Sequence, residues 1–146
     1  RQANNKELEN FYPAFKAVKD YVVQAPEKTT GWYLPSIGQW YDFTANLGGL
    51  PSWDDAINEG NDLTPNLYRW SNQTELVSKI NAYFEPLGTG NYDAIPNGSY
   101  QKFFSSSTYS DSGIWTWFVG KQANVVQCWH NVRYNSDSAV RPILAF

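Results

Sequence analysis

The chain of 146 residues is long enough for one domain with a sizeable core and too short for two catalytic domains. Its 42% of hydrophobic and 17% of charged residues argue against intrinsic disorder and a coiled coil, and its net charge of -3 argues against binding to nucleic acid or to an anionic membrane surface. One Cys and one His exclude an internal disulfide, a thiolate metal cluster and a multi-histidine metal site, so we expect neither a metal nor a cofactor.

Apolar residues at helical spacing predict a first amphipathic helix over residues 10–23. They are Leu8, Phe11, Phe15, Val18 and Val22. Pro13 is compatible with this helix if it lies in the first turn. The polar residues 25–31 then predict a loop.

A second helix is predicted to begin near Ile37, because Ser36 and Gln39 have the spacing of a capping box. Gly48 and Gly49 supply a residue that can adopt the left-handed conformation at its end. The predicted inward face consists of Ile37, Trp40, Tyr41, Thr44 and Leu47. We expect Trp40, together with Trp32 from the preceding segment, to be buried against a sheet.

Residues 50–70 show neither a period of two nor one of 3.6 and predict an ordered irregular loop. Asn72 and Glu75 repeat the capping pattern, and a third helix is expected to follow and to end near Gly88. Its predicted apolar face consists of Leu76, Ile80, Tyr83 and Phe84.

The second half of the chain predicts four strands, over residues 100–106, 114–119, 124–131 and 139–146. Each is rich in aromatic or β-branched residues and is bounded by Ser, Gly, Asp or Asn. We therefore predict one α+β domain over residues 1–146, with helices of the N-terminal half packed on a twisted antiparallel sheet from the C-terminal half.

Three segments in this order are similar to the C-type-lectin-like fold, most closely to its branch of formylglycine-generating-enzyme-like and Bacteroidota surface proteins. They are GWYLPSIGQW at 31–40, FFSSSTYSDSGIWTW at 103–117 and VRPILAF at 140–146, and with the spacing between them they span residues 10–146. The matching positions are Trp32, Leu34, Pro35, Ser36 and Trp40; then Phe104, Ser105, Ser106, Thr108 and Tyr109; then Val140, Arg141, Pro142, Ala145 and Phe146.

The resemblance implies a fold without the catalytic chemistry of the branch. Its enzymes need an active-site cysteine pair or equivalent metal ligands, and this chain has only Cys128. Calcium-binding lectins carry Glu-Pro-Asn or Gln-Pro-Asp with Trp-Asn-Asp, whereas the nearest strings here are EPL at 85–87 and WHN at 129–131. Members also begin with a strand that pairs with the last one, and because residues 1–9 are too polar for it, we expect the domain to begin upstream of Arg1.

Other polar groups have a structural interpretation that we favour. Asp54, Asp55, Glu59 and Asp62 have the chemistry of calcium ligands or of a glycosidase pair, but their spacing favours a solvated loop. Cys128 and His130 share a face if they lie on a strand, yet no third group orients them as a nucleophilic pair. For Arg141, pairing with an internal carboxylate or carbonyl is favoured over contact with a ligand carboxylate.

The candidate binding surface lies in residues 114–135, where aromatic residues occupy both faces of the predicted strands. In variable proteins of this branch, which retroelements diversify, the strands and loops before the terminal segment display the ligand-binding surface. We assign Trp115 to the core. The predicted ligand-binding residues are Trp117, Phe118, Trp129, His130, Asn131, Arg133 and Tyr134.

The predicted function is that of a non-enzymatic recognition domain, an adhesin-like module that binds a glycan or a protein ligand at the extracellular or outer-membrane surface. No window reaches the ~18 apolar residues of a membrane span, so we expect no membrane insertion by this segment. The alternatives are a structural subunit of a pilus or surface assembly, and a carbohydrate hydrolase that uses Asp or Glu. An unpaired sheet edge favours assembly, and two facing carboxylates favour hydrolysis.

Overall fold

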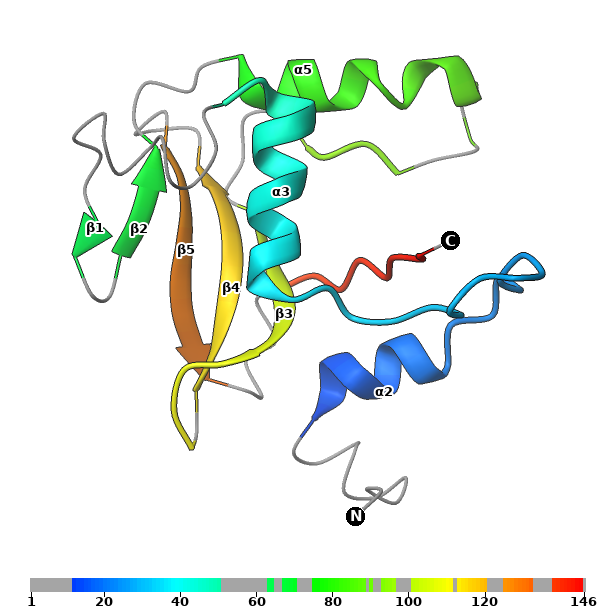
Figure 1. Cartoon of the computed structure of the whole chain (residues 1–146), viewed down its shortest axis with the longest axis horizontal. Helices are drawn as coiled ribbons and strands as arrows, with labels where there is room; N and C mark the ends of the chain where they lie inside the picture. The colour runs from blue at the N-terminus through cyan, green and yellow to red at the C-terminus, as the bar shows by residue number, and fades with distance from the viewer. Residues whose placement is uncertain are drawn as a thin grey trace.

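The computed structural model describes residues 12–50, 63–64, 67–70, 75–88, 90, 93–96, 101–111, 113–120, 125–132 and 138–145, with the backbone alone at 63–64, 67–70, 120 and 125–132. The helices are α2 (Pro13–Lys19), α3 (Ile37–Gly48), α5 (Leu76–Ala82) and the 3-10 turn η1 (Glu85–Leu87). The strands are β1 (Leu63–Thr64), β2 (Leu67–Trp70), β3 (Gln101–Thr108), β4 (Gly113–Gly120) and β5 (Val125–Val132). The chain is therefore an α+β protein, as predicted (Figure 1).

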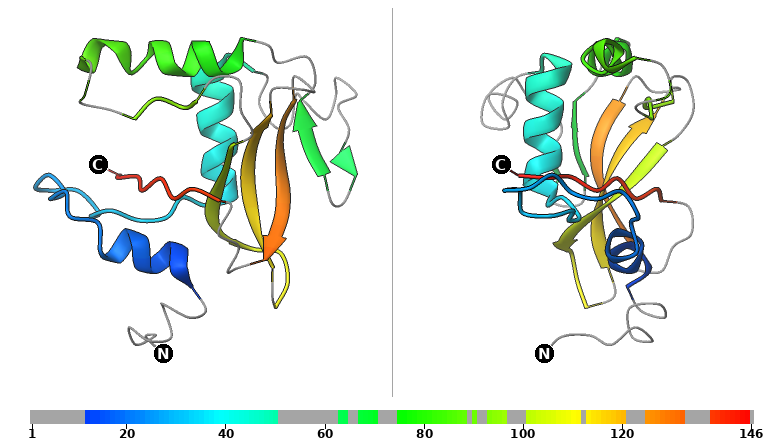
Figure 2. Two further views of the ribbon diagram at one scale, coloured as in Figure 1. Left: turned by 180° about the vertical axis from the view of Figure 1, so that it is seen from behind. Right: turned by 90° about the vertical axis from the view of Figure 1, so that its right-hand side faces the viewer.

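The sheet is antiparallel throughout and has the order β1-β2-β5-β4-β3. Helix α3 lies across one face of the sheet, with α5 above it (Figure 1). Helix α2 and the C-terminal segment lie beyond β3, on the side of the sheet away from β1 (Figure 2). The prediction that the sheet comes from the C-terminal half is wrong for β1 and β2, which precede α5.

Two predictions about where strands form need correction. In both segments the pairing partner, and not the local sequence pattern, determines whether a strand forms. Residues 67–70, predicted to be irregular, form β2 because β5 pairs with them, with Leu67 opposite Trp129. Residues 139–146 form no regular strand among those described, and Ala139 and Ile143 make isolated bridges to Phe103 and Tyr33. Pro142 has no N–H group to donate to a continuous ladder.

Helix α3 agrees with its prediction at both ends. The Ser36 side chain accepts from the Gln39 N–H, and the Gln39 side chain accepts from the Ser36 N–H, which completes the capping box. Gly49 ends the helix in the left-handed region with φ of 66°. Trp40, Thr44 and Gly48 form its buried stripe.

Helix α2 is shorter than predicted, although Pro13 does occupy its first turn. The helix ends at Lys19, so Val22 lies outside it and is 94% exposed. The buried residues of the helix are Ala14 and Val18, while Phe15, predicted to face inward, is 39% exposed. A helix of two turns presents a narrower buried face than the periodicity suggested.

Helix α5 begins at Leu76 with Glu75 as its N-cap, and the Glu75 side chain makes no capping bond; the predicted capping residue Asn72 lies outside the described residues. Leu76, Val77 and Ile80 are buried, and η1 carries the chain to Gly88. Tyr83 is 60% exposed, so its predicted inward position is wrong. It follows the last residue of α5 and therefore leaves the helical stripe.

The main core cluster lies between α3, α5 and the sheet. Its centre is a parallel stack of Trp40 on Trp117, with ring centroids 4.8 Å apart and an interplanar angle of 2°. Trp40 is 2% exposed, and its indole N–H donates to the Phe104 carbonyl at 3.1 Å. The predicted burial of Trp40 is confirmed. The other buried members are Leu76, Val77, Ile80, Ile95, Phe103 and Val119.

A second buried cluster joins α2 to the outer part of the sheet. Its members are Ala14, Val18, Leu34, Phe104 and Ile114. Phe103 and Phe104 are neighbours on β3 and belong to different clusters, as expected for a strand that is covered on both faces. Trp32 packs against this second cluster and is only partly buried, so its predicted burial holds in part.

The three segments that carry the resemblance meet at the outer edge of β3. The N–H of Ser106 donates to the Pro35 carbonyl at 2.8 Å, and the Ile37 N–H donates to Ser107 Oγ at 3.0 Å. On the same edge, the Phe104 N–H donates at 3.0 Å to the carbonyl of Ala139, which directly precedes the third segment, and Ile143 of that segment exchanges main-chain hydrogen bonds with Tyr33. The serines of β3 thus connect the N-terminus of α3 to the sheet, and the C-terminal segment covers the strand edge that would otherwise be unpaired.

Candidate functional site

A groove of about 520 Å³ lies beside β3, where segments that are distant in the sequence converge. Its walls are aromatic and come from Tyr21, Trp32, Phe43, Phe84 and Phe103. Its charged lining residues are Asp93 and Arg141, and the C-terminal residues 139–143 complete it. We call it the Arg141 groove. Its volume falls in the range of ~300–1,000 Å³ that small-molecule sites occupy.

The Arg141 guanidinium is held in the groove by two contacts. Its Nη2 donates to the main-chain carbonyl of Asp93 at 2.5 Å, and its Cζ lies 5.7 Å from the centroid of the Phe103 ring. Burial lowers the pKa of Arg141 from its ordinary value, while the nearby Asp93 carboxylate and Tyr21 act in the opposite direction. Arginine remains protonated in such surroundings, so the groove carries a partly desolvated positive charge.

Most of the hydrogen-bonding capacity of this guanidinium is open to a ligand. A guanidinium has five N–H donors, and the Asp93 carbonyl accepts from one nitrogen. In the described part of the chain, the only salt bridge joins Lys16 and Asp20. The described residues supply no second hydrogen-bond partner for the guanidinium beside the Asp93 carbonyl. We therefore take its remaining N–H groups as available to a ligand in the groove that Arg141 lines.

The aromatic walls are fixed in place by contacts with one another and with residues outside the groove. Tyr21 and Trp32 meet edge to face with centroids 5.1 Å apart, and the Trp32 indole donates to the Val23 carbonyl at 2.6 Å. Phe43 packs edge to face on Trp40 and on Trp117, at 5.5 Å and 5.8 Å between centroids. The groove is therefore largely preformed, which lowers the entropy lost when a ligand binds.

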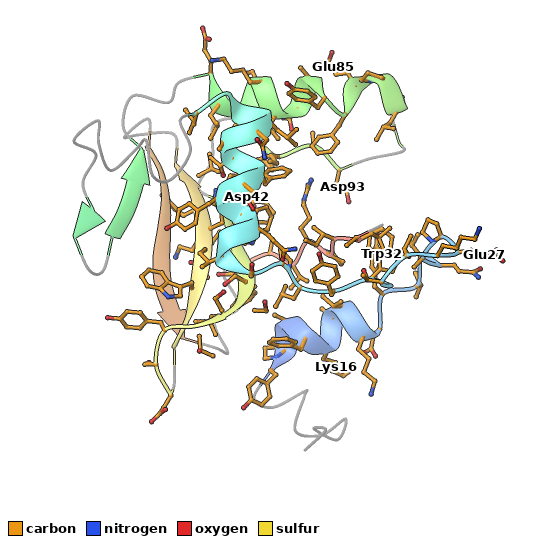
Figure 3. The ribbon with its side chains drawn as sticks, in the orientation of Figure 1. Lys16, Glu27, Trp32, Asp42, Glu85 and Asp93 are labelled. Carbon is orange, nitrogen blue, oxygen red and sulfur yellow. The ribbon has the colours of Figure 1, made fainter. Side chains whose placement is uncertain are left out.

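The segment that carries Asp93 is anchored independently of Arg141. The Asn81 side chain donates to the Ile95 carbonyl at 2.8 Å and accepts from the Ile95 N–H at 2.9 Å. Ile95 itself is buried in the main core cluster. Asp93 lies on this segment after α5, and Trp32 lies on the segment between α2 and α3 (Figure 3). The Asp93 side chain is exposed, so its carboxylate is available at the rim.

A smaller pocket of about 290 Å³ lies between α2 and the β3–β4 pair. Its lining residues are Tyr12, Ala14, Phe15, Ser106, Thr108 and Ile114. Tyr12 and Phe15 meet edge to face with centroids 6.2 Å apart. None of the lining residues that the structure describes here is charged, so the Arg141 groove offers the more distinctive chemistry.

The structure corrects the predicted binding surface at its two residues on β4. Trp117 is 0% exposed and Phe118 is 8% exposed, so the prediction that they face solvent is wrong. Trp117 is taken up by the stack with Trp40. Phe118 lies on the opposite face of the strand, where Ile114 and Thr116 are also buried. Both faces of β4 are covered, which local sequence could not indicate.

The structure describes the other predicted binding residues by their backbone alone or does not describe them. Trp129, His130 and Asn131 lie on β5, opposite Thr116, Trp115 and Ile114 of β4 in the ladder. Arg133 and Tyr134 lie outside the described residues, as do the acidic loop residues Asp54, Asp55, Glu59 and Asp62. Cys128 is on the same strand as His130, opposite Trp117.

The described residues contain no group of three or more His, Cys, Asp or Glu that is able to hold a metal ion. None of the helices that the structure describes is long and apolar enough to cross a membrane.

Arg141 follows the favoured interpretation, because its guanidinium donates to an internal carbonyl. Its position in a groove with Tyr21, Phe84 and Asp93 was not predicted. These residues come from three separate segments, and no local pattern links them. The one signal in the sequence was the placement of an arginine in the terminal segment VRP at 140–142, which carries part of the family resemblance. No family model, curated protein or solved structure matches the chain.

Proposed function

We propose that the chain is a non-catalytic recognition domain of the C-type-lectin-like type, which binds a glycan or protein ligand at the outer surface of a bacterial cell. The observation that carries the proposal is the Arg141 groove, in which fixed aromatic walls surround the Arg141 guanidinium. The Asp93 carbonyl accepts from one nitrogen of this guanidinium, which leaves its other N–H groups for a ligand. Aromatic side chains and arginine are the residues that contribute most to the free energy of binding at recognition surfaces.

The assignment to the C-type-lectin-like type is supported by the meeting of its three characteristic segments. Tyr33 and Ile143 exchange two main-chain hydrogen bonds of 3.0 Å, and Ser106 and Ser107 contact the chain at Pro35 and Ile37. Segments that resemble a family in sequence are expected to be neighbours in its fold. The placement on the cell surface rests on the resemblance and on the many aromatic residues.

A structural subunit that adds strands is less well supported, because the described sheet offers little free edge. At the outer edge of β3, the Phe104 N–H donates to the Ala139 carbonyl and the Ser106 N–H donates to the Pro35 carbonyl. The opposite edge is β1, which has two residues. A strand from another subunit needs a longer row of unpaired N–H and C=O groups.

Hydrolysis is supported by no described pair of facing carboxylates. Asp93 is the carboxylate that lines the Arg141 groove, and its neighbour there is a cation. An acid–base pair in a glycosidase consists of two carboxyl groups on either side of the scissile bond.

The predicted surface on β5 and the segment after it remains a second location for ligand binding within this proposal. It comprises Trp129, His130, Asn131, Arg133 and Tyr134. Strands β3 and β4 lie between β5 and the outer sheet edge that borders the Arg141 groove, so the two locations can be tested separately.

Screening of the purified chain on a glycan array and against surface extracts tests the proposal, with His130→Ala and Arg141→Gln as paired variants. Loss of binding in one variant and not in the other assigns the ligand to one location. Single substitutions at an anchor should remove ~1 kcal/mol or more of the free energy of binding. Cleavage of a glycan by the wild-type chain would contradict the proposal, since a recognition domain releases its ligand intact.

A further inference from the structure

We propose that the Arg141 groove binds the carboxylate of an acidic sugar, a pyranose ring that carries one carboxyl group. This inference rests on the proposed recognition function and deepens it, because it names the ligand class and the residue that selects it. Arg141 would hold the carboxylate through the donors that its contact with Asp93 leaves unused.

The charge in the groove suits a monoanion. Among the lining residues that the structure describes, Arg141 is the cationic side chain and Asp93 is the anionic one. A planar guanidinium matches the geometry of a carboxylate with two parallel N–H···O bonds. A phosphate dianion would face the Asp93 carboxylate with no second cation among the described lining residues to offset the stronger repulsion.

The walls suit a ring with apolar faces and polar edges. Tyr21, Trp32 and Phe84 offer aromatic surface against which a pyranose ring can pack. The exposed Asp93 carboxylate at the rim can accept hydrogen bonds from ring hydroxyl groups. The groove is partly open to solvent, so a sugar chain can continue beyond the bound residue.

An extended peptide is a poorer fit, because the main chain beside the groove is already paired. Ile143 exchanges hydrogen bonds with Tyr33, and Ala139 bonds to Lys102 and Phe104. The Ala145 carbonyl accepts from the Thr30 N–H. Recognition by strand addition depends on free main-chain groups, and this segment has few.

The test compares matched ligands by calorimetric titration of the wild-type chain. The probes are oligosaccharides that end in glucuronic acid or in N-acetylneuraminic acid, each with a counterpart in which the carboxyl group is reduced to an alcohol. We expect at least one acidic probe to bind roughly tenfold more tightly than its reduced counterpart, since charged hydrogen bonds contribute most of this difference. The two acids distinguish a uronate from a sialic acid as the source of the carboxylate.

The Arg141→Lys variant keeps the positive charge and removes the planar fork. We expect its affinity for the acidic probe to fall roughly tenfold while its affinity for the reduced probe is unchanged. Because the comparison of ligands on the wild-type chain needs no variant, the inference stays testable if Arg141→Lys folds poorly.

Equal affinity for the acidic and reduced probes would overturn the inference and leave the recognition function in place. Binding of a peptide C-terminus that depends on Arg141, with no binding of the acidic sugars, would do the same. Absence of binding to any glycan or protein would overturn both.

Discussion

Gly48 gives the sharpest test of how α3 packs on α5. A Cβ atom at this position would lie 2.1 Å from Leu76 Cδ1, 3.4 Å from Leu76 Cγ and 3.9 Å from Ile80 Cδ1. Leu76 is 2% exposed and Ile80 is 0% exposed, so neither side chain has open space into which it can move. The glycine is required here by the close approach of two helices.

Two effects of opposite sign decide the outcome of Gly48→Ala. Alanine is favoured over glycine inside a helix by up to ~1 kcal/mol, and overpacking of a close-packed core costs ~1–3 kcal/mol. A contact of 2.1 Å is far inside van der Waals distance, so the steric effect should dominate. We expect the free energy of unfolding to fall by ~1–2 kcal/mol, which lowers the Tm by about 3–7 °C in a chain of this size.

Gly38→Ala is the matched control, because it lies in the same helix and faces solvent. Its Cβ would have one neighbour, Ser36 Oγ at 3.7 Å, which is an ordinary contact. Helix propensity then acts without opposition, and stability should rise by up to ~1 kcal/mol. Urea unfolding of both variants measures the difference. If Gly48→Ala were as stable as Gly38→Ala, the contact between α3 and Leu76 would be wrong.

Three further outcomes follow from the core and the cap. Trp40→Ala should lower the free energy of unfolding by ~3–5 kcal/mol in denaturant titration, because it removes one half of the stack with Trp117; a wild-type midpoint would contradict the stack. Ser36→Ala should cost ~1 kcal/mol by thermal unfolding through loss of the capping box, whereas Asp42→Ala, exposed on the same helix, should stay within ~0.5 kcal/mol. EDTA should change neither the Tm nor ligand binding, and a large shift would indicate a cation site in the loop at residues 54–62.

The features that could be predicted from sequence are those set by neighbouring residues. Ser36, Gln39 and Gly49 satisfy the ends of α3 through bonds that span one helical turn, so their spacing is informative by itself. Strands β3, β4 and β5 likewise follow from runs of aromatic and β-branched residues between turns.

The features that could not be predicted depend on partners far along the chain. Residues 67–70 become β2 because β5, more than fifty residues later, pairs with them. The Arg141 groove joins residues from before α3, after α5 and near the C-terminus. Neither arrangement leaves a periodic signal in the sequence, because each residue makes its contact with a partner that is far away along the chain.

The aromatic excess shows why composition misplaced part of the site. The predicted binding surface depended on the helices and the strands around Tyr100 and Phe146 supplying most of a core, which would leave the late aromatic residues facing solvent. Trp40 instead needs Trp117 as its stacking partner, and Phe103 and Phe43 pack around that pair. Aromatic residues from both halves of the chain form one cluster, which removes Trp117 from the surface.

The last prediction asks whether Arg141 serves stability or binding. The segment from Asp93 to Ile95 is already fixed by the two Asn81 hydrogen bonds, and Ile95 is 1% exposed. Asn81→Ala should therefore leave two main-chain groups of a buried residue unpaired, at a cost of ~1–3 kcal/mol.

Arg141→Met keeps much of the apolar stem and removes the charge. The Asp93 carbonyl that loses its donor belongs to an exposed residue and can bind water, while the desolvation of a guanidinium is relieved. We expect the stability of Arg141→Met to stay within ~0.5 kcal/mol of the wild type, measured by urea unfolding beside Asn81→Ala. A loss as large as that of Asn81→Ala would mean that Arg141 is a structural clamp, and the desolvated charge would then need no ligand to account for it.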